Sequence, residues 1–197
     1  MQKALIIVLL VVVAGLAYMV FVQNPRHQVE AVVNIDTVDA PVNGKDKKLK
    51  RGKFVNLHID SMAIHKAERQ LLIFSKEQLV KTYNVALGLN PVGKKEVEGD
   101  FKTPEGSYHI DGKNPLSAYH KSLGISYPNE DDIARAQELG QRPGGDIKIH
   151  GLMKHMNNPG KAHIKSNWTS GCIAVTDEEI DELYAQVKTG TPVFIAP

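Results

Sequence analysis

The stretch that decides the fold class is Leu79-Val80-Lys81-Thr82-Tyr83-Asn84-Val85-Ala86-Leu87, in which apolar and polar side chains alternate. A period of two residues is typical of a half-buried β-strand. Residues 54–59 alternate in the same way, and residues 70–74 are largely apolar. Short polar turns separate these runs. The sequence therefore predicts antiparallel strands.

Further short runs extend this pattern along the chain. We expect additional strands at residues 31–35, 106–111, 146–150, 172–175 and 192–195. A helix is predicted over residues 129–139, because acidic residues follow Pro128 and Gly140 ends the run. A second helix should begin near Thr176, since Thr176 and Glu179 have the spacing of a capping box. The predicted class is α+β: a mainly β sandwich or closed sheet with a few helices.

The N-terminal region carries a long apolar segment. Residues 4–22 contain no charged side chain, and this length of helix can cross a hydrocarbon core of about 30 Å. Two interpretations compete: a transmembrane anchor, or a signal peptide cleaved after a site such as Gly15-Leu16-Ala17. The anchor is favoured, because the run exceeds the 7 to 15 residues of a usual signal core and the cleavage site lies inside it.

Either interpretation places the rest of the chain in the cell envelope. We expect an anchor or signal at residues 1–23, a juxtamembrane stem at 24–51 and a folded domain at 52–197. The protein would face the periplasm from the inner membrane, or be free in the periplasm if cleaved. A net charge of +2 gives no reason to expect nucleic acid as a partner. The basic run at 45–53 indicates at most weak attraction to an anionic surface.

The chain has one cysteine, Cys172, which cannot form an internal disulfide. It follows a Ser-Gly pair and precedes an apolar run, while His150 ends the run Ile147-Lys148-Ile149-His150. A thiol becomes a useful nucleophile when an imidazole accepts its proton. Taken singly, each residue could instead be an ordinary core residue.

Zinc is the other chemistry to weigh. His150, His155, His163 and Cys172 could supply ligands. The sequence lacks a His-Glu-x-x-His or Cys-x-x-Cys pair, so the spacing is unspecific. We expect no metal and no cofactor.

Three blocks in order carry a family resemblance: Gly99-Asp100-Phe101-Lys102-Thr103-Pro104-Glu105-Gly106, then Ile149-His150-Gly151, then Ser170-Gly171-Cys172. Together they resemble the L,D-transpeptidase (YkuD) catalytic domain over residues 57–197. The resemblance implies a cell-wall enzyme whose cysteine attacks a peptidoglycan stem peptide. A thioester forms, terminal D-alanine leaves, and an amine or water resolves the thioester. The expected partners are stem peptides, the membrane and a wall-linked protein.

The resemblance also implies residue roles. Cys172 would be the nucleophile, His150 the proton carrier, and Gly151 the residue whose carbonyl orients the imidazole. The backbone N–H groups of Gly171 and Cys172 would form the oxyanion hole. Tyr127 and Trp168 are candidate substrate-binding residues.

One position departs from the family's pattern. Ser170 stands where a histidine is usual, two residues before the cysteine, and this departure bears on acceptor choice. A hydrolase is therefore the alternative, either an L,D-carboxypeptidase or an amidase that releases wall-linked protein. A non-catalytic wall-binding module is a third interpretation. Residues 152–168 are interpreted as a lid or pocket wall, or as a surface loop.

Overall fold

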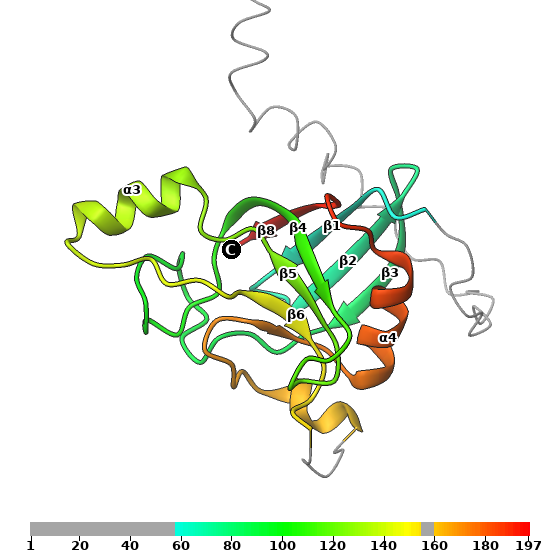
Figure 1. Ribbon diagram of the computed structural model, residues 1–197. Helices are drawn as coiled ribbons and strands as arrows, with labels where there is room; N and C mark the ends of the chain where they lie inside the picture. Colours follow the sequence, from blue (N-terminus) through cyan, green and yellow to red (C-terminus); the bar gives the residue numbers. More distant parts are fainter. Residues whose placement is uncertain (1–57, 155–159) are drawn as a thin grey trace, which may run out of the picture. The chain divides into compact units, whose positions relative to one another are not determined.

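A mixed β-sheet dominates the computed structural model, which describes residues 58–154 and 160–197 (Figure 1). Its strands lie in the order β3-β2-β1-β8-β4-β5-β6-β7. Two pairs, β1–β8 and β6–β7, are parallel, and the other five are antiparallel. The strands are β1 (Ser61–His65), β2 (Gln70–Ser75), β3 (Gln78–Asn84), β4 (Gly106–Asn114), β5 (Ser122–Ile125), β6 (Lys148–His150), β7 (Ile173–Ala174) and β8 (Pro192–Ala196). The prediction of a mainly β fold is confirmed.

Two α-helices and a 3₁₀-helix accompany the sheet in the described residues: α3 (Glu130–Glu138), α4 (Asp177–Gln186) and η2 (Gly160–Lys165). Both α-helices begin where their caps predict. Asn129 and Asp132 form a capping box at α3, and Thr176 and Glu179 form one at α4. Each box satisfies backbone N–H groups that a helix start leaves free. In Figure 1, α3 extends away from the strands, whereas α4 lies beside them.

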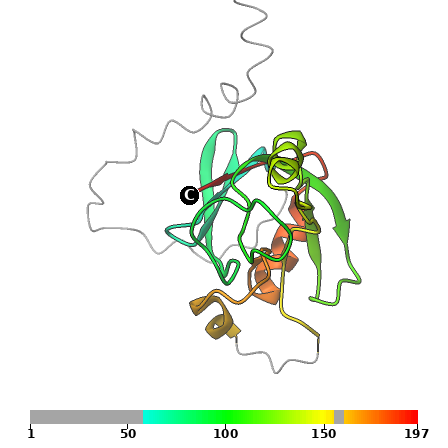
Figure 2. The same ribbon diagram turned by 90° about the vertical axis from the view of Figure 1, so that its left-hand side faces the viewer.

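Helix α4 contacts both ends of the sheet. Its Glu182 accepts a hydrogen bond from the Tyr83 hydroxyl of β3 at 2.9 Å. Its Asp177 accepts one from the Leu152 N–H, just beyond β6, at 2.8 Å. Ile180 is fully buried in the core. The sheet therefore curves around α4 as a half-barrel, and the turn of the ribbon is visible in Figure 2.

The central strands explain where the sequence prediction failed. The predicted strand at 54–59 is described only at residues 58 and 59, which are not in a strand, and its other residues lie outside the described part. The strand β1 that follows was not predicted. Met62, Ala63 and Ile64 are all buried, so β1 shows no alternation of apolar and polar residues. β5 was also missed. It has four residues, one of them Gly124, and a Cβ at Gly124 would lie 2.1 Å from a carboxylate oxygen of Asp111.

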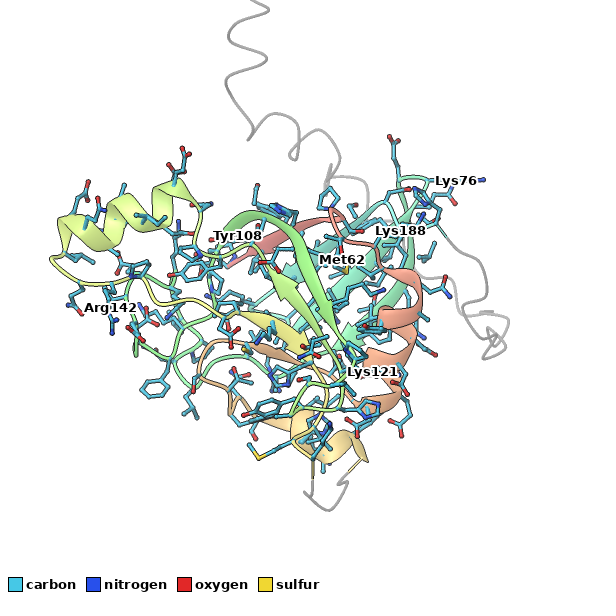
Figure 3. All side chains as sticks on the ribbon, viewed as in Figure 1. Met62, Lys76, Tyr108, Lys121, Arg142 and Lys188 are labelled. Atoms are coloured by element: carbon cyan, nitrogen blue, oxygen red, sulfur yellow. The ribbon has the colours of Figure 1, made fainter. Side chains whose placement is uncertain are left out.

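The predicted strand at 31–35, the apolar segment at 4–22 and the stem at 24–51 lie outside the described residues. Among the described helices, none has the length and apolar character that a membrane crossing requires. Figure 3 shows Met62 and Tyr108 among the strands, whereas Lys76 and Arg142 lie at the periphery.

Candidate active site

A pocket of about 660 Å³ opens beside β6 and β7. This volume lies in the range of small-molecule sites. Four segments line it: Asn114 at the end of β4 with residues 117–119, residues 145–148 with His150, Met153, and residues 168–170 with Cys172. Cys172 and His150 therefore share one pocket although 22 residues separate them in sequence. The parallel pairing of β6 with β7 brings them together.

A tight turn holds Cys172 at the start of β7. The Thr169 hydroxyl donates to the Cys172 carbonyl at 2.7 Å and accepts from the Gly171 N–H at 3.1 Å. Gly171 has φ +129°, and a Cβ there would lie 2.6 Å from the Lys102 carbonyl oxygen. Only glycine fits this close approach. The Gly171 N–H is thus engaged within the turn, which contradicts its predicted place in the oxyanion hole. The Cys172 N–H stays a prediction.

His150 is held in one tautomer. Its Nδ1 lies 2.7 Å from the Gly151 carbonyl oxygen, and since a carbonyl only accepts, Nδ1 carries the proton. In the neutral ring, Nε2 is then free of a proton and can accept one. Gly151 is required here, because a Cβ would lie 2.4 Å from a carboxylate oxygen of Asp177.

Two aromatic rings enclose the imidazole. The centroid of Tyr119 lies 4.5 Å from that of His150, and Trp168 lies 5.8 Å away in an edge-on arrangement. The His150 residue is 4% exposed. This burial lowers the pKa of His150 below its usual value, and the Gly151 carbonyl opposes the effect only in part. His150 is therefore neutral at pH 7 and available as a base.

The thiol of Cys172 is also neutral at rest. Its Sγ donates to the Asp146 carbonyl at 3.6 Å. Burial raises the pKa of Cys172, and a backbone hydrogen bond from Lys148 opposes this. Desolvation disfavours the charged form of each group. The site thus starts from a thiol and a neutral imidazole rather than from an ion pair.

The loop at residues 99–106 supports the turn that carries Cys172. The Asp100 carboxylate accepts from the N–H groups of Glu96, Val97 and Lys102 and from the Lys95 ammonium. Thr103 is buried, and its hydroxyl accepts from the Gly88 N–H at 3.1 Å. The fixed backbone places the Phe101 and Lys102 carbonyls against Gly88 and Gly171. The loop at residues 99–106 thus supports the turn that carries Cys172 through contact with Gly171.

The other residues predicted for the site differ in whether they line the pocket. Trp168 and Ser170 line the pocket. Tyr127 does not, which corrects its prediction as a substrate-binding residue: it is buried in the core, and its hydroxyl donates to the Pro143 carbonyl at 2.9 Å. Tyr119, in a segment that the sequence indicates could line the cleft, does line the pocket, whereas sequence reasoning missed Lys148. Lys148 could have been found, because it lies two residues before His150 on a strand.

Among the described residues, the side chains considered as zinc ligands do not come together. Both ring nitrogens of His163 face backbone carbonyls, Nδ1 that of Gly160 at 2.7 Å and Nε2 that of Val175 at 3.0 Å. His155 lies outside the described residues. Across residues 58–154 and 160–197, no group of three or more potential ligands is placed to hold a metal ion. Within 152–168, Met153 and Trp168 form pocket wall.

A cysteine and a buried histidine base in one pocket are the groups that cysteine-dependent acyl transfer requires. Residues 59–195 match the L,D-transpeptidase catalytic domain family, YkuD. The chain is 33% identical over 140 residues to a protein of Escherichia coli K12 named "Putative L,D-transpeptidase YafK", covering 68% of this chain and 49% of that protein. The chain belongs to the L,D-transpeptidase (YkuD) family.

The solved structures agree with this fold. The helical cell shape determining protein Pgp2 of Campylobacter jejuni, as a K307A mutant, superposes with a TM-score of 0.53 at 23% identity, covering 72% of this chain and 48% of that one. A structure of Pgp2 without that mutation gives the same TM-score and identity. The chain spans about half the length of the curated relatives it matches.

Proposed function

We propose that the protein is a cysteine acyltransferase that acts on peptidoglycan stem peptides as an L,D-transpeptidase. Nε2 of His150 takes the Sγ proton of Cys172, and the thiolate attacks the carbonyl between the third residue and terminal D-alanine. The C–N bond breaks, and the imidazolium returns the proton to the D-alanine amine. The resulting thioester is attacked by an amine of a second stem, which restores the thiol.

The hydrogen bond between His150 Nδ1 and the Gly151 carbonyl carries this proposal. It leaves Nε2 as the basic nitrogen in a pocket that also holds Cys172. The neutral starting pair means that proton transfer accompanies attack, as in general base catalysis. Membership of the family supports the stem peptide as substrate.

The test is incubation of the full-length chain with a tetrapeptide donor ending in D-alanine, followed by intact mass and product analysis. We expect a thioester adduct on Cys172 and release of D-alanine. Cys172→Ala should form no adduct, and His150→Gln should slow acylation by about 10² to 10⁴. His163→Ala is the control, because His163 binds backbone carbonyls outside the pocket lining. An adduct in Cys172→Ala would refute the assignment.

Hydrolysis is the second candidate, and Ser170 favours it. This exposed side chain borders the pocket beside Cys172, where the family usually has a histidine. If water resolves the thioester, the products are a tripeptide and D-alanine, without a cross-linked dimer. An amidase would instead release a wall-linked protein. The product masses distinguish these outcomes.

We also propose an envelope location, with residues 4–22 as the membrane anchor. The support is the uncharged run and the wall substrate. A reporter fused to the C-terminus should be active only outside the cytoplasm. A reporter active in the cytoplasm would overturn both the location and access to the wall.

A further inference from the structure

Lys148 belongs to the pocket wall rather than to the core. On β6 the middle residue Ile149 is fully buried. Because successive side chains of a strand point to opposite faces, Lys148 and His150 share the other face. His150 lines the pocket, and so does Lys148. Of the described residues that line the pocket, Lys148 alone carries a permanent positive charge.

The counterion of Lys148 is loosely held. Nζ of Lys148 lies 2.5 Å from a carboxylate oxygen of Asp146, but the Asp146 side chain is 81% exposed, against 34% for Lys148. Exposed ion pairs contribute little to stability. A carboxylate entering the pocket can therefore replace Asp146 without leaving a buried charge unpaired.

The backbone just before Lys148 also contacts the sulphur of Cys172. Asp146 has φ +61°, an uncommon conformation for a residue with a side chain, and its carbonyl accepts from Sγ at 3.6 Å. Lys148 lies two residues after this carbonyl, at the start of β6. The ammonium thus branches from backbone close to the carbonyl that contacts Cys172.

The geometry of a stem peptide fits this position. When the carbonyl carbon under attack lies at Sγ of Cys172, the residue that follows it in the peptide is the one that leaves. Consecutive Cα atoms are about 3.8 Å apart, so the α-carboxylate of a terminal leaving residue lies about one residue from the bond that breaks. The Lys148 side chain spans a comparable distance between its Cα and its ammonium group.

We propose that Lys148 binds the free α-carboxylate of the leaving residue, with Asp146 holding the ammonium in the pocket when no substrate is bound. This inference rests on the proposed function. It makes the enzyme specific for a bond next to a chain end, and it assigns that specificity to one side chain. A mid-chain peptide bond has no carboxylate to offer Lys148.

The experiment compares two donors that differ in one group: a tetrapeptide ending in D-alanine and the same peptide ending in D-alaninamide. The full-length chain should acylate at least about 10-fold faster with the acid, as for a charge-assisted pair in a pocket. In Lys148→Met, kcat/KM for the acid should fall about 10- to 100-fold, and the preference for acid over amide should disappear. Lys148→Arg should retain the preference.

Two further variants keep the test decisive. Lys121→Met is the matched control, because Lys121 pairs with an aspartate, Asp181, at 2.7 Å outside the pocket lining. It should leave the preference unchanged. Asp146→Asn removes the competing carboxylate, and asparagine tolerates a positive φ. It should lower KM for the acid but not for the amide.

The outcomes separate the inference from the function beneath it. Acylation by the full-length chain with equal rates for acid and amide would overturn the role of Lys148, as would a Lys148→Met variant that keeps the preference. If Lys148→Met does not fold, as judged by circular dichroism, an unchanged KM in Asp146→Asn overturns the proposal instead. Absence of any Cys172 adduct with both donors would refute the proposed function itself.

Discussion

At the scale of single residues, Cys172 and His150 both favour their uncharged forms. Burial raises the pKa of the thiol and lowers that of the imidazole. A thiolate–imidazolium pair requires the opposite order of pKa values, as in cysteine proteases with a strongly lowered thiol pKa. These directions keep the proton on sulphur and leave the imidazole neutral. The thiol is thereby protected from off-pathway alkylation and oxidation, which act on the thiolate.

The first prediction concerns the pH dependence of alkylation. Cys172 is the only cysteine, so iodoacetamide incorporation measured by mass reports on this thiol alone. Because its pKa is raised, the alkylation rate should still increase with pH above about pH 8.5, the ordinary pKa of a cysteine. His150→Gln should keep that rising profile. A rate that is flat from about pH 5 upward would indicate an ion pair and contradict the neutral resting state.

The second prediction concerns Ser170 and the fate of the thioester. In the proposed mechanism acylation depends on Cys172 and His150, whereas the exposed Ser170 borders the pocket beside Cys172. Ser170→His should therefore change the ratio of amine-resolved to water-resolved product while acylation changes less than about tenfold. Ser166→His is the control, because Ser166 is exposed and does not line the pocket. An unchanged ratio would show that position 170 does not control acceptor choice.

At the scale of elements, the loop at 99–106 is as important as the strands. Burial alone would raise the pKa of Asp100, but the Lys95 ammonium and three backbone N–H groups lower it below its ordinary value. Lys66, itself buried, reaches the same loop through the Thr103 carbonyl and the Glu105 carboxylate. These charged contacts hold backbone against Gly171, so a loop without pocket residues determines the position of Cys172.

The third prediction follows from the carboxylate of Asp100. Asp100→Asn should reduce the free energy of unfolding by about 1 to 3 kcal/mol at neutral pH, because hydrogen bonds to a charged group are lost. A lowered folded-state pKa gives stability that is present above the unfolded pKa and is lost as pH falls through the folded pKa. The difference between the proteins should therefore shrink below about pH 3.9. Urea unfolding of both proteins, at neutral pH and below about pH 3.9, measures this difference in the free energy of unfolding.

The control for this variant is Glu98→Gln, just before this loop. Glu98 pairs with Arg142 at 2.8 Å, but both side chains are mostly exposed. It should change stability by less than about 1 kcal/mol. A pH-independent loss in Asp100→Asn would indicate that shape, not charge, matters at position 100.

Elements were predictable where local residues determine them. The caps of α3 and α4 lie within four residues of the turns they satisfy, and both helices form where predicted. β1 was not predictable, because burial on both faces removes alternation. The prediction that Tyr127 binds substrate was wrong for a similar reason. Its sequence neighbours do not reveal that its ring packs in the core, with its centroid 6.0 Å from that of Tyr108. The prediction that Cys172 and His150 share a site came from the order of the family's motifs along the chain. The parallel pairing of β6 with β7 is what brings the two residues together.

At the scale of the whole described unit, β8 joins two halves of the sheet. The last strand of the chain lies between β1 and β4, parallel to one and antiparallel to the other. Val193 and Ile195 are each 1% exposed. The half with β1–β3 and the half with β4–β7 therefore meet along β8. They meet a second time after β3, where Ala86 pairs with Ala174 of β7 and Gly88 pairs with Thr169. Residues 62–65 pair with residues more than 120 positions away, so folding must close a long loop.

The last prediction tests whether both halves unfold together. Ile195→Ala should lower the free energy of unfolding by about 2 to 5 kcal/mol, the usual cost of a cavity in a core. Trp168, the only tryptophan, lies in the pocket beside β6 and β7, far in sequence from β1–β3. If β8 makes the sheet one cooperative unit, Trp168 fluorescence and far-ultraviolet circular dichroism should shift to the same lower urea midpoint. Leu116→Ala, at a side chain 82% exposed, should leave both midpoints in place. Separate midpoints in Ile195→Ala would mean that the pocket half is stable without its junction to β1, and that β8 does not couple the active site to the rest of the sheet.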